Sequence, residues 1–453
     1  MGSDTKRITK LYSQSAILTI GTILVAVLLF FFKVIFYQKS QPFLYSEFLL
    51  AYSFYLFYSL FGYLNVGNPL SNDAYKTRVI KENGIAEYLF NAIYLVIIFS
   101  FLSSLTFAIN LAVLKINGFV ILQFCLAMLF SNINLVLIAF FRGIEKIVTS
   151  SSLLAMKGAF KTAILYLFSF LLLMNAVKIT LAFLLGELIS AIISILILVF
   201  WIKRNSIVIP PLFKPNFPII KRYFLQCIPL VLISFSFQGY NSFIYTIVEH
   251  HVSKVALGYL DVAVTFLTFF IAFFNNIGLM LAANSDRFNK TKGFFKFLFL
   301  QIFSMSIAIT VLYEIIAYFI DFDDNILQEV FNLDGGTLAR SVMIILPALS
   351  FYVLFNVVSG YKQGKRQYYS ISLASILAIL LSFLPGYLLI IHLGLDGALF
   401  SFILFSFLLA VLVISMTARD SFEMRMAKFF KNMRKRRREK VLFKNNNFGV
   451  NGE

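Results

Sequence analysis

Residues 179–201 read ITLAFLLGELISAIISILILVFW, a run of 23 residues in which Glu187 is the one charged side chain. A helix of about 20 apolar residues crosses the roughly 30 Å hydrocarbon core of a bilayer. The run is too long and too evenly apolar for a strand of a membrane barrel, which spans about ten residues and alternates polar with apolar side chains. This stretch therefore predicts a transmembrane helix.

Runs of the same kind recur along the whole chain of 453 residues. Apolar residues make up 60% of the chain and charged residues 13%, whereas soluble domains are about 45–50% apolar and about 25% charged. The predicted fold class is an all-α polytopic membrane protein. The sequence predicts twelve spans, at residues 14–36, 44–65, 86–114, 119–141, 155–177, 179–201, 223–248, 256–281, 294–320, 338–360, 367–391 and 393–416.

A connection rich in proline divides the predicted spans into two sets of six. Residues 203–222 contain four prolines, which disfavour continuation of a helix. Because six is even, both sets begin on the same side of the membrane, so any internal repeat is a parallel one. We expect four parts: an amino-terminal bundle (1–202), a cytoplasmic linker (203–222), a carboxy-terminal bundle (223–417) and a basic cytoplasmic tail (418–453).

The distribution of charge predicts the orientation of the chain. There are 39 Lys and Arg against 21 Asp and Glu, a net charge of +18. With the amino terminus in the cytoplasm, 33 of the 39 basic residues fall on the cytoplasmic side, as the positive-inside rule requires. Both termini are therefore expected to be cytoplasmic. The tail has 11 basic residues from Arg419 to Lys444, which we expect to bind anionic membrane lipids rather than nucleic acid.

Two carboxylates within the predicted spans are candidates for ion coupling. Glu187 follows Lys178 by nine residues, about 13 Å along a helix, which places it near the midplane of the bilayer. A carboxylate there suits a proton or sodium site, and a Glu that is hydrogen-bonded in helix packing is the alternative. Asp261 is nearer the outer end of its span and is either a second coupling site or an interfacial residue.

Three lysines are candidates for binding an anionic headgroup. Lys157 and Lys161 are four residues apart and share one face of a helix. From Thr162 to Asn175 only 14 residues remain, about 21 Å of helix, which is too short to cross the membrane. The span must therefore begin upstream and draw at least Lys161 into the membrane. Snorkelling to the surface is the alternative. The same two readings, binding of a headgroup or snorkelling to the surface, apply to Lys33 near the outer end of the first span.

Polar side chains follow one face of the seventh predicted span. Ser234, Gln238, Asn241 and Tyr245 recur at helical spacing, and Pro229 upstream permits a bend. They indicate either the wall of a cavity or hydrogen bonds between helices. The same two readings apply to the polar residues Gln123, Asn132 and Asn134 of the fourth span.

The sequence contains no catalytic constellation, phosphate loop or dinucleotide fingerprint. His250 and His251 are adjacent and lack the spacing of four that places two metal ligands on one helix face. Cys125 and Cys227 lie inside apolar runs and predict neither a disulfide framework nor a metal motif. We therefore expect a protein that is not an enzyme and that has no cofactor and no metal site.

Short motifs in both halves carry a resemblance to a known family. In the first half they are Leu44-Tyr45-Ser46-Glu47-Phe48 and Leu64-Asn65-Val66-Gly67-Asn68-Pro69, and in the second Cys227-Ile228-Pro229-Leu230 and Leu257-Gly258-Tyr259-Leu260-Asp261-Val262-Ala263. With twelve spans in two parallel halves, the chain resembles the multidrug/oligosaccharidyl-lipid/polysaccharide (MOP) flippase superfamily, most of all the Wzx-type O-antigen and polysaccharide repeat-unit flippases. It departs from relatives that carry an Asp-Arg pair in the seventh span, where this chain has Asn241-Ser242.

The resemblance implies a flippase of the bacterial inner membrane. Its substrate is an undecaprenyl-diphosphate-linked oligosaccharide, and alternating access, coupled to H⁺ or Na⁺, moves this substrate between leaflets. The diphosphate needs cations, for which we assign Lys157, Lys161 and Lys33. The sugars need polar walls, for which we assign Gln238, Asn241 and Tyr245. Glu187 and Asp261 are assigned to the coupling ion, and a polysaccharide polymerase is a candidate partner.

Several rival functions stay open. A cation-coupled multidrug exporter shares the fold but should bind cationic drugs near buried carboxylates. A lipid II flippase is a closer neighbour, although fourteen helices are more usual in that branch. A non-transporting scaffold and a polysaccharide polymerase come from different classes, and a polymerase usually has a larger external loop than residues 321–336 supply.

Overall fold

The computed structural model describes residues 20–21, 24–25, 27–28, 42–80, 84–171, 175–207, 215–284, 311, 315, 334–364 and 367–447. Its ordered elements in these ranges are α-helices. They are α2 (Pro42–Tyr63), α3 (Gly67–Ile80), α4 (Ile85–Val113), α5 (Gly118–Gly143), α6 (Ile147–Leu171), α7 (Ala176–Arg204), α8 (Phe217–His251), α9 (Lys254–Asn284), α12 (Gly335–Ile345), α13 (Pro347–Gly364) and α14 (Tyr368–Asn447).

Seven helical segments within the described ranges are long and apolar enough to cross a membrane, which makes the chain a multi-pass membrane protein. They are Phe48–Tyr75, Ile85–Val113, Gly118–Gly143, Ala176–Arg204, Phe217–His251, Gly336–Gln363 and Tyr368–Thr417. The predicted spans at 14–36 and 294–320 lie largely outside the described residues, so the total of twelve and the cytoplasmic position of both termini stay predictions.

Large apolar side chains are exposed along one face of α4, as expected of a protein whose solvent is lipid. Ile98, Phe101, Leu105 and Ile109 follow one another at helical spacing and are between 52% and 71% exposed. In water such a stripe would be an unusually large apolar patch. Against lipid tails it is the ordinary outer surface of a spanning helix.

Helix α6 begins at Ile147, upstream of its two lysines, as the length argument predicted. Its 25 residues give a length of about 37 Å at about 1.5 Å per residue. Lys157 therefore lies near the middle of the helix rather than at its end. Both cysteines of the chain are free, which agrees with the expectation of no disulfide.

Three local features were not anticipated from the sequence. The connection after the second predicted span contains helix α3 (Gly67–Ile80), which packs against α4, α5 and α8. The span predicted at 338–360 lies within the apolar segment Gly336–Gln363, and this segment is divided into α12 and α13 at Pro347, which lacks the N–H that a continuous helix needs. The basic tail continues α14 as helix as far as Asn447.

Helix α14 contains a hairpin at Gly394, between the last two predicted spans. Gly394 has φ 61° and ψ −126°, in the region that glycine adopts without the steric cost of a Cβ. Ser401 Oγ donates a hydrogen bond to the carbonyl oxygen of Gly386 at 3.1 Å. In a continuous helix these residues would be about 22 Å apart, so the chain reverses direction at Gly394.

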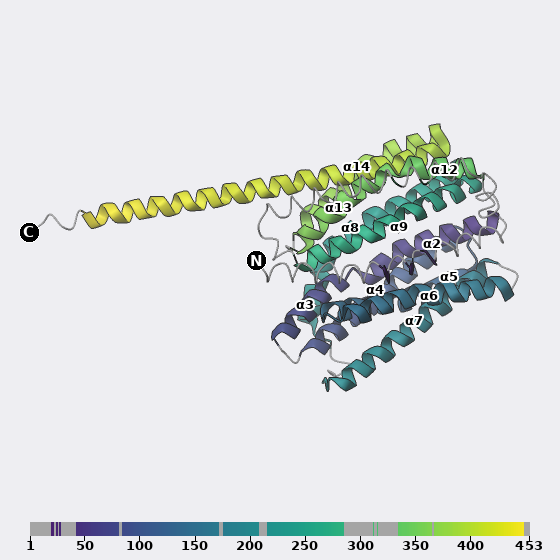
Figure 1. Cartoon of the computed structure of the whole chain (residues 1–453), viewed down its shortest axis with the longest axis horizontal. Coiled ribbons are helices and arrows are strands. Elements are labelled where there is room, and N and C mark those ends of the chain that lie inside the picture. The colour runs from purple at the N-terminus through teal and green to yellow at the C-terminus, as the bar shows by residue number, and fades with distance from the viewer. Residues whose placement is uncertain are drawn as a thin grey trace, which may run out of the picture.

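The helices form two groups that meet along α2 (Figure 1). In the first group α2 packs on α4, α5 packs on α4 and α7, and α6 packs on α7. In the second group α14 packs on α8, and α13 packs on α9 and α14. Contacts between the groups are made mainly by α2 with α8 and α9. Helix α3 lies at the end of the bundle from which the carboxy-terminal part of α14 projects (Figure 1).

Candidate functional site

A lysine–glutamate cluster, formed by Lys157, Lys161 and Glu187, lies inside the first group of helices. Glu187 comes from α7 and is fully buried, and both lysines come from α6 and are 8% exposed. The Nζ atom of Lys161 is 3.0 Å from Glu187 Oε1, and the Nζ atom of Lys157 is 3.6 Å from Glu187 Oε2. The structure therefore brings Lys157 and Lys161, which were assigned to the diphosphate, into contact with Glu187, which was assigned to the coupling ion.

A close approach of α6 and α7 holds this cluster together. A Cβ atom added to Gly186 would lie 2.6 Å from the Cα atom of Lys161, so only a glycine permits this helix spacing. Lys157 Nζ donates a hydrogen bond to Ser131 Oγ of α5 at 2.6 Å. Lys161 Nζ lies 4.9 Å from the centroid of the Phe183 ring, within the range of a cation–π interaction.

The charges of the cluster do not balance. Two ammonium groups face one carboxylate, which leaves one surplus positive charge in the interior if all three groups are ionised. Ionised groups within a membrane protein are costly and typically face a water-filled path or a substrate site. A surplus cation is a feature that suits an anionic ligand.

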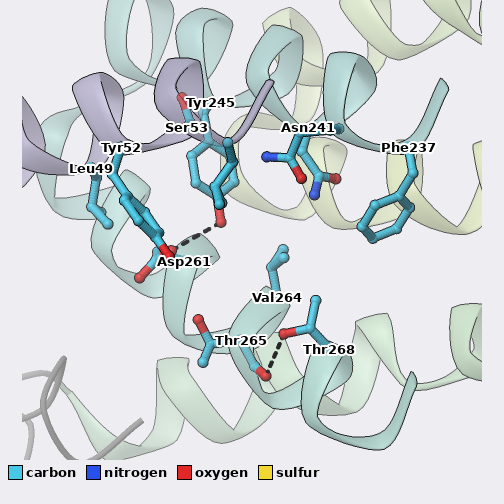
Figure 2. Close-up of a pocket in the computed structure, with 12 residues that line it drawn as sticks. Leu49, Tyr52, Ser53, Phe237, Asn241, Tyr245, Asp261, Val264, Thr265 and Thr268 are labelled. Carbon is cyan, nitrogen blue, oxygen red and sulfur yellow. Dashed lines mark hydrogen bonds between the residues drawn. The ribbon is translucent and has the colours of Figure 1, made fainter. Parts of the chain in front are cut away.

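A cavity of about 210 Å³ lies between α2, α8 and α9, where the two groups of helices meet. Figure 2 shows α2 side chains along one wall, α8 side chains along another and α9 side chains across from them. Its lining residues are Leu49, Tyr52, Ser53, Leu56, Phe237, Gln238, Asn241, Tyr245, Asp261, Val264, Thr265 and Thr268. The polar stripe predicted on the seventh span thus supplies three residues of this wall, Gln238, Asn241 and Tyr245.

Asp261 is the acidic residue of the cavity. The hydroxyl of Tyr245 donates a hydrogen bond to Asp261 Oδ1 at 3.1 Å (Figure 2). Asp261 is only 2% exposed. Asn241 Oδ1 is buried without a hydrogen-bond partner among the described residues, which leaves an acceptor in the cavity wall for a ligand or a water molecule.

Aromatic rings lie between the cluster and the cavity. Tyr52 lines the cavity and also contacts Phe183 edge to face, with ring centroids 5.6 Å apart. Tyr55, one turn further along α2, contacts the same ring at 5.2 Å. Because Lys161 lies over Phe183 as well, the contacts of Phe183 and Tyr52 connect the positive cluster to the cavity wall.

The remaining polar predictions have mixed outcomes. Ser234 of the predicted stripe accepts a hydrogen bond from Asn65 Nδ2 at 2.5 Å and does not line the cavity. Asn132 and Asn134 make hydrogen bonds between helices, Asn132 with Ser59 and Ser100, and Asn134 with Ser190 and Ser194. Lys33 lies outside the described residues. Within those residues no group of three or more His, Cys, Asp and Glu side chains could hold a metal ion.

The two groups of helices are also joined by polar contacts at the end that carries α3. Asn65, which follows α2, donates to the carbonyl oxygen of Leu230 in α8 at 3.0 Å. Arg222 of α8 forms an ion pair with Asp73 of α3. Asn216 Nδ2, before α8, donates to Glu87 Oε1 of α4 at 2.7 Å. Helix α3, which was not predicted from the sequence, is thus part of the junction between the two groups of helices.

No protein-family model matches this sequence, and no curated protein matches it. Solved structures match it along nearly the whole chain. A eukaryotic MATE transporter, AtDTX14, is 13% identical, with a TM-score of 0.70 over 90% of this chain and 96% of the other. A MOP superfamily transporter from Pyrococcus furiosus, described as having a binding pocket of reverse polarity, is 15% identical, with a TM-score of 0.68 over 90% and 95%.

A third structure, the outward-facing conformation of a multidrug resistance MATE family transporter of the MOP superfamily, is 15% identical, with a TM-score of 0.65 over 90% of this chain and 95% of the other. TM-scores of 0.65 to 0.70 over 90% of this chain show a shared fold, and the extent of the match includes both groups of helices. The chain has the fold of the MATE transporters of the MOP superfamily.

Proposed function

We propose that this protein is a transporter that works by alternating access and moves a lipid-linked oligosaccharide across a bacterial inner membrane. The observation that carries the proposal is the surplus positive charge of the Lys157–Glu187–Lys161 cluster, close to a cavity with polar and aromatic walls. The shared fold supports the transport mechanism, since MATE transporters have been solved in both outward-facing and inward-facing conformations. The chain accordingly belongs to the Wzx-type branch in this proposal.

The lysine–glutamate cluster suits the diphosphate of the substrate, and the cavity suits its sugars. Lys157 and Lys161 bind the diphosphate of an undecaprenyl-diphosphate carrier, with Lys33 as a third cation. Gln238, Asn241 and Tyr245 contact the sugars. The cavity, at about 210 Å³, is smaller than the roughly 300 Å³ at which ligand pockets begin, so it holds one part of an oligosaccharide in this conformation. The halves 1–202 and 223–417 move relative to each other to admit the rest.

Ion coupling in this proposal uses H⁺ or Na⁺. Glu187 and Asp261 are the two carboxylates that would take the ion, and each is at most 2% exposed. The tail beyond residue 418 binds anionic lipid, and a polysaccharide polymerase is the protein partner we expect. The chain acts as a transporter rather than as an enzyme.

A multidrug exporter is the second candidate. Asp261 favours it, because a carboxylate in a cavity lined by Tyr52, Phe237 and Tyr245 is also what a cationic, aromatic drug would bind. The lysine–glutamate cluster argues against it, since a surplus cation repels such a drug.

A deletion strain separates the two candidates. The flippase proposal predicts loss of surface polysaccharide and build-up of lipid-linked oligosaccharide in the inner leaflet, with unchanged drug susceptibility. Intact surface polysaccharide together with increased drug susceptibility would favour the exporter. Expression of the wild-type chain from a plasmid should reverse the phenotype in either case.

A further inference from the structure

The residues assigned to the diphosphate and the residue assigned to the coupling ion form one site. Glu187 lies 3.0 Å from one lysine ammonium and 3.6 Å from the other, so its carboxylate occupies the position that a phosphate oxygen on the two lysines would take. An anion that binds both lysines at hydrogen-bond distance must meet or displace this carboxylate. Binding of the substrate and the state of Glu187 are therefore linked.

The balance of charge gives the direction of this linkage. The empty cluster holds two positive charges and one negative charge. A diphosphate diester brings two negative charges, which match the two lysines and leave the Glu187 carboxylate without a partner. An unpaired carboxylate in a fully buried position is strongly disfavoured, so a cation must neutralise it when the substrate binds.

We propose that Glu187 is an internal competitor that the substrate's diphosphate displaces from Lys157 and Lys161, and that the displaced carboxylate takes up one monovalent cation. This inference rests on the proposed function and specifies how its ion coupling works. Each substrate that binds carries one H⁺ or Na⁺ with it, because only then do the lysines, the diphosphate and Glu187 reach neutrality together. Release of the substrate returns Glu187 to the lysines and expels the cation.

Among the residues that the structure describes, no other charged group lies close enough to Glu187 to take over this role. The titratable groups that face the cluster in the described part of the chain are Lys157 and Lys161 from α6, with the phenols of Tyr52 and Tyr55 from α2. The hydroxyl of Ser131 in α5 also faces the cluster and accepts a hydrogen bond from Lys157. The phenols and the hydroxyl supply hydrogen bonds rather than a second carboxylate, so Glu187 is the group that must respond to an added anion.

Binding of farnesyl-diphospho-N-acetylglucosamine, a diphosphate diester with two negative charges like the proposed substrate, to the purified full-length chain in lipid nanodiscs tests this inference. Calorimetry in buffers of different ionisation enthalpy gives the number of protons taken up for each ligand bound. Titrations in NaCl and in choline chloride give the dependence on Na⁺. We expect uptake of about one cation by the wild-type chain, as H⁺ or as Na⁺, because the charge deficit is one.

The variant Glu187→Gln removes the competing charge while preserving the shape of the side chain. It should bind the same diphosphate diester at least about tenfold more tightly, since like charges at close range cost several kcal/mol and each ~1.4 kcal/mol is a factor of ten. It should take up no cation. Glu145→Gln, at an exposed position in the turn between α5 and α6, is the matched control and should behave as the wild type does.

Each outcome tests either the competition between Glu187 and the diphosphate or the proposed function. A wild-type chain that binds the ligand without cation uptake overturns the competition, and this measurement needs no variant should Glu187→Gln fail to fold. A folded Glu187→Gln variant that binds no more tightly than the wild type overturns it too. If neither protein binds the diphosphate, the phosphate site itself is wrong, and the proposed function fails with it.

Discussion

The carboxylate of Glu187 in α7 lies 3.0 Å from the ammonium nitrogen of Lys161 in α6. Both side chains are almost completely enclosed, and Lys157 approaches the same carboxylate from one helical turn away. Taking an ion pair out of solvent costs free energy that its own attraction seldom exceeds. A site of this kind is expected where the charges are needed for a ligand.

Removing the carboxylate should destabilise the protein strongly. Glu187→Ala leaves two buried ammonium groups without a counter-charge, and loss of one partner of a buried pair costs about 3–5 kcal/mol. The triple variant Lys157→Met, Lys161→Met, Glu187→Leu removes every charge and should be about as stable as the wild type. Unfolding in SDS, followed by the fluorescence of Trp201, the one tryptophan, measures both. Equal destabilisation by the two variants would contradict a buried ion cluster.

Helix spacing at the cluster should depend on Gly186. Gly186→Ala places a methyl group 2.6 Å from the Lys161 Cα atom, and overpacking of this kind costs about 1–3 kcal/mol. Because α6 and α7 must separate, transport should fall as well. Gly118→Ala is the control, since a Cβ there meets nothing within 4 Å. A Gly186→Ala variant that transports normally would show that the close approach is unnecessary.

A separate prediction concerns Asp261, the acidic residue of the cavity. Asp261→Asn removes its charge, and transport should lose its dependence on the coupling ion if Asp261 contributes to coupling. Tyr245→Phe removes the hydrogen bond to Asp261, worth about 1.5–3 kcal/mol for a charged acceptor, and should weaken ion dependence without abolishing it. Ion-driven uptake into proteoliposomes measures both. An unchanged ion dependence in Asp261→Asn would leave Glu187 as the one coupling carboxylate.

The contacts at the α3 end should control which conformation is populated. The pair of Arg222 and Asp73 is partly exposed, so Arg222→Ala should change the free energy of unfolding by no more than about 1 kcal/mol. It should nevertheless loosen the junction between the two groups and speed maleimide labelling of a cysteine placed at Ser234, in a chain whose own two cysteines have been replaced.

Arg340→Ala is the matched control for that experiment. Arg340 forms an exposed ion pair with Asp396, but both residues belong to the second group of helices. Its removal should leave labelling at position 234 unchanged. If Arg222→Ala and Arg340→Ala give the same labelling rate, the α3 contacts do not hold the two groups together.

Much of this arrangement is predictable from the sequence, because hydropathy and helical spacing depend on local order. Helical spacing predicts that Lys157 and Lys161 share one face, and the length of the span draws at least Lys161 into the membrane. Glu187 is predicted near the midplane, and Gln238, Asn241 and Tyr245 are predicted on one face of their helix. The pairing of Glu187 with the lysines is not predictable in this way, since it depends on which helices are neighbours and how each is rotated. Tyr52 and Tyr55 were missed because nothing in their spacing distinguishes them among 22 tyrosines.

Helix α3 was missed for a related reason. Its sequence, with Asp73 and several other polar residues, is too hydrophilic to cross a membrane, and a search for spans treats it as a connection. The structure shows that it packs between the two groups of helices, where its polar residues find partners. A short amphiphilic helix of this kind is defined by tertiary contacts rather than by its own hydropathy.

The measurement that tests the central claim most directly is polysaccharide export by a deletion strain that carries the double variant Lys157→Gln, Lys161→Gln. Export is normalised to the level of folded protein, because an unpaired Glu187 destabilises the variant. The account predicts that this normalised export falls at least about a hundredfold, because two charged contacts of about 1.5–3 kcal/mol each are lost. The matched control, Lys203→Gln with Lys221→Gln, alters two exposed lysines and should export normally. Normal export by the Lys157, Lys161 variant would contradict the account.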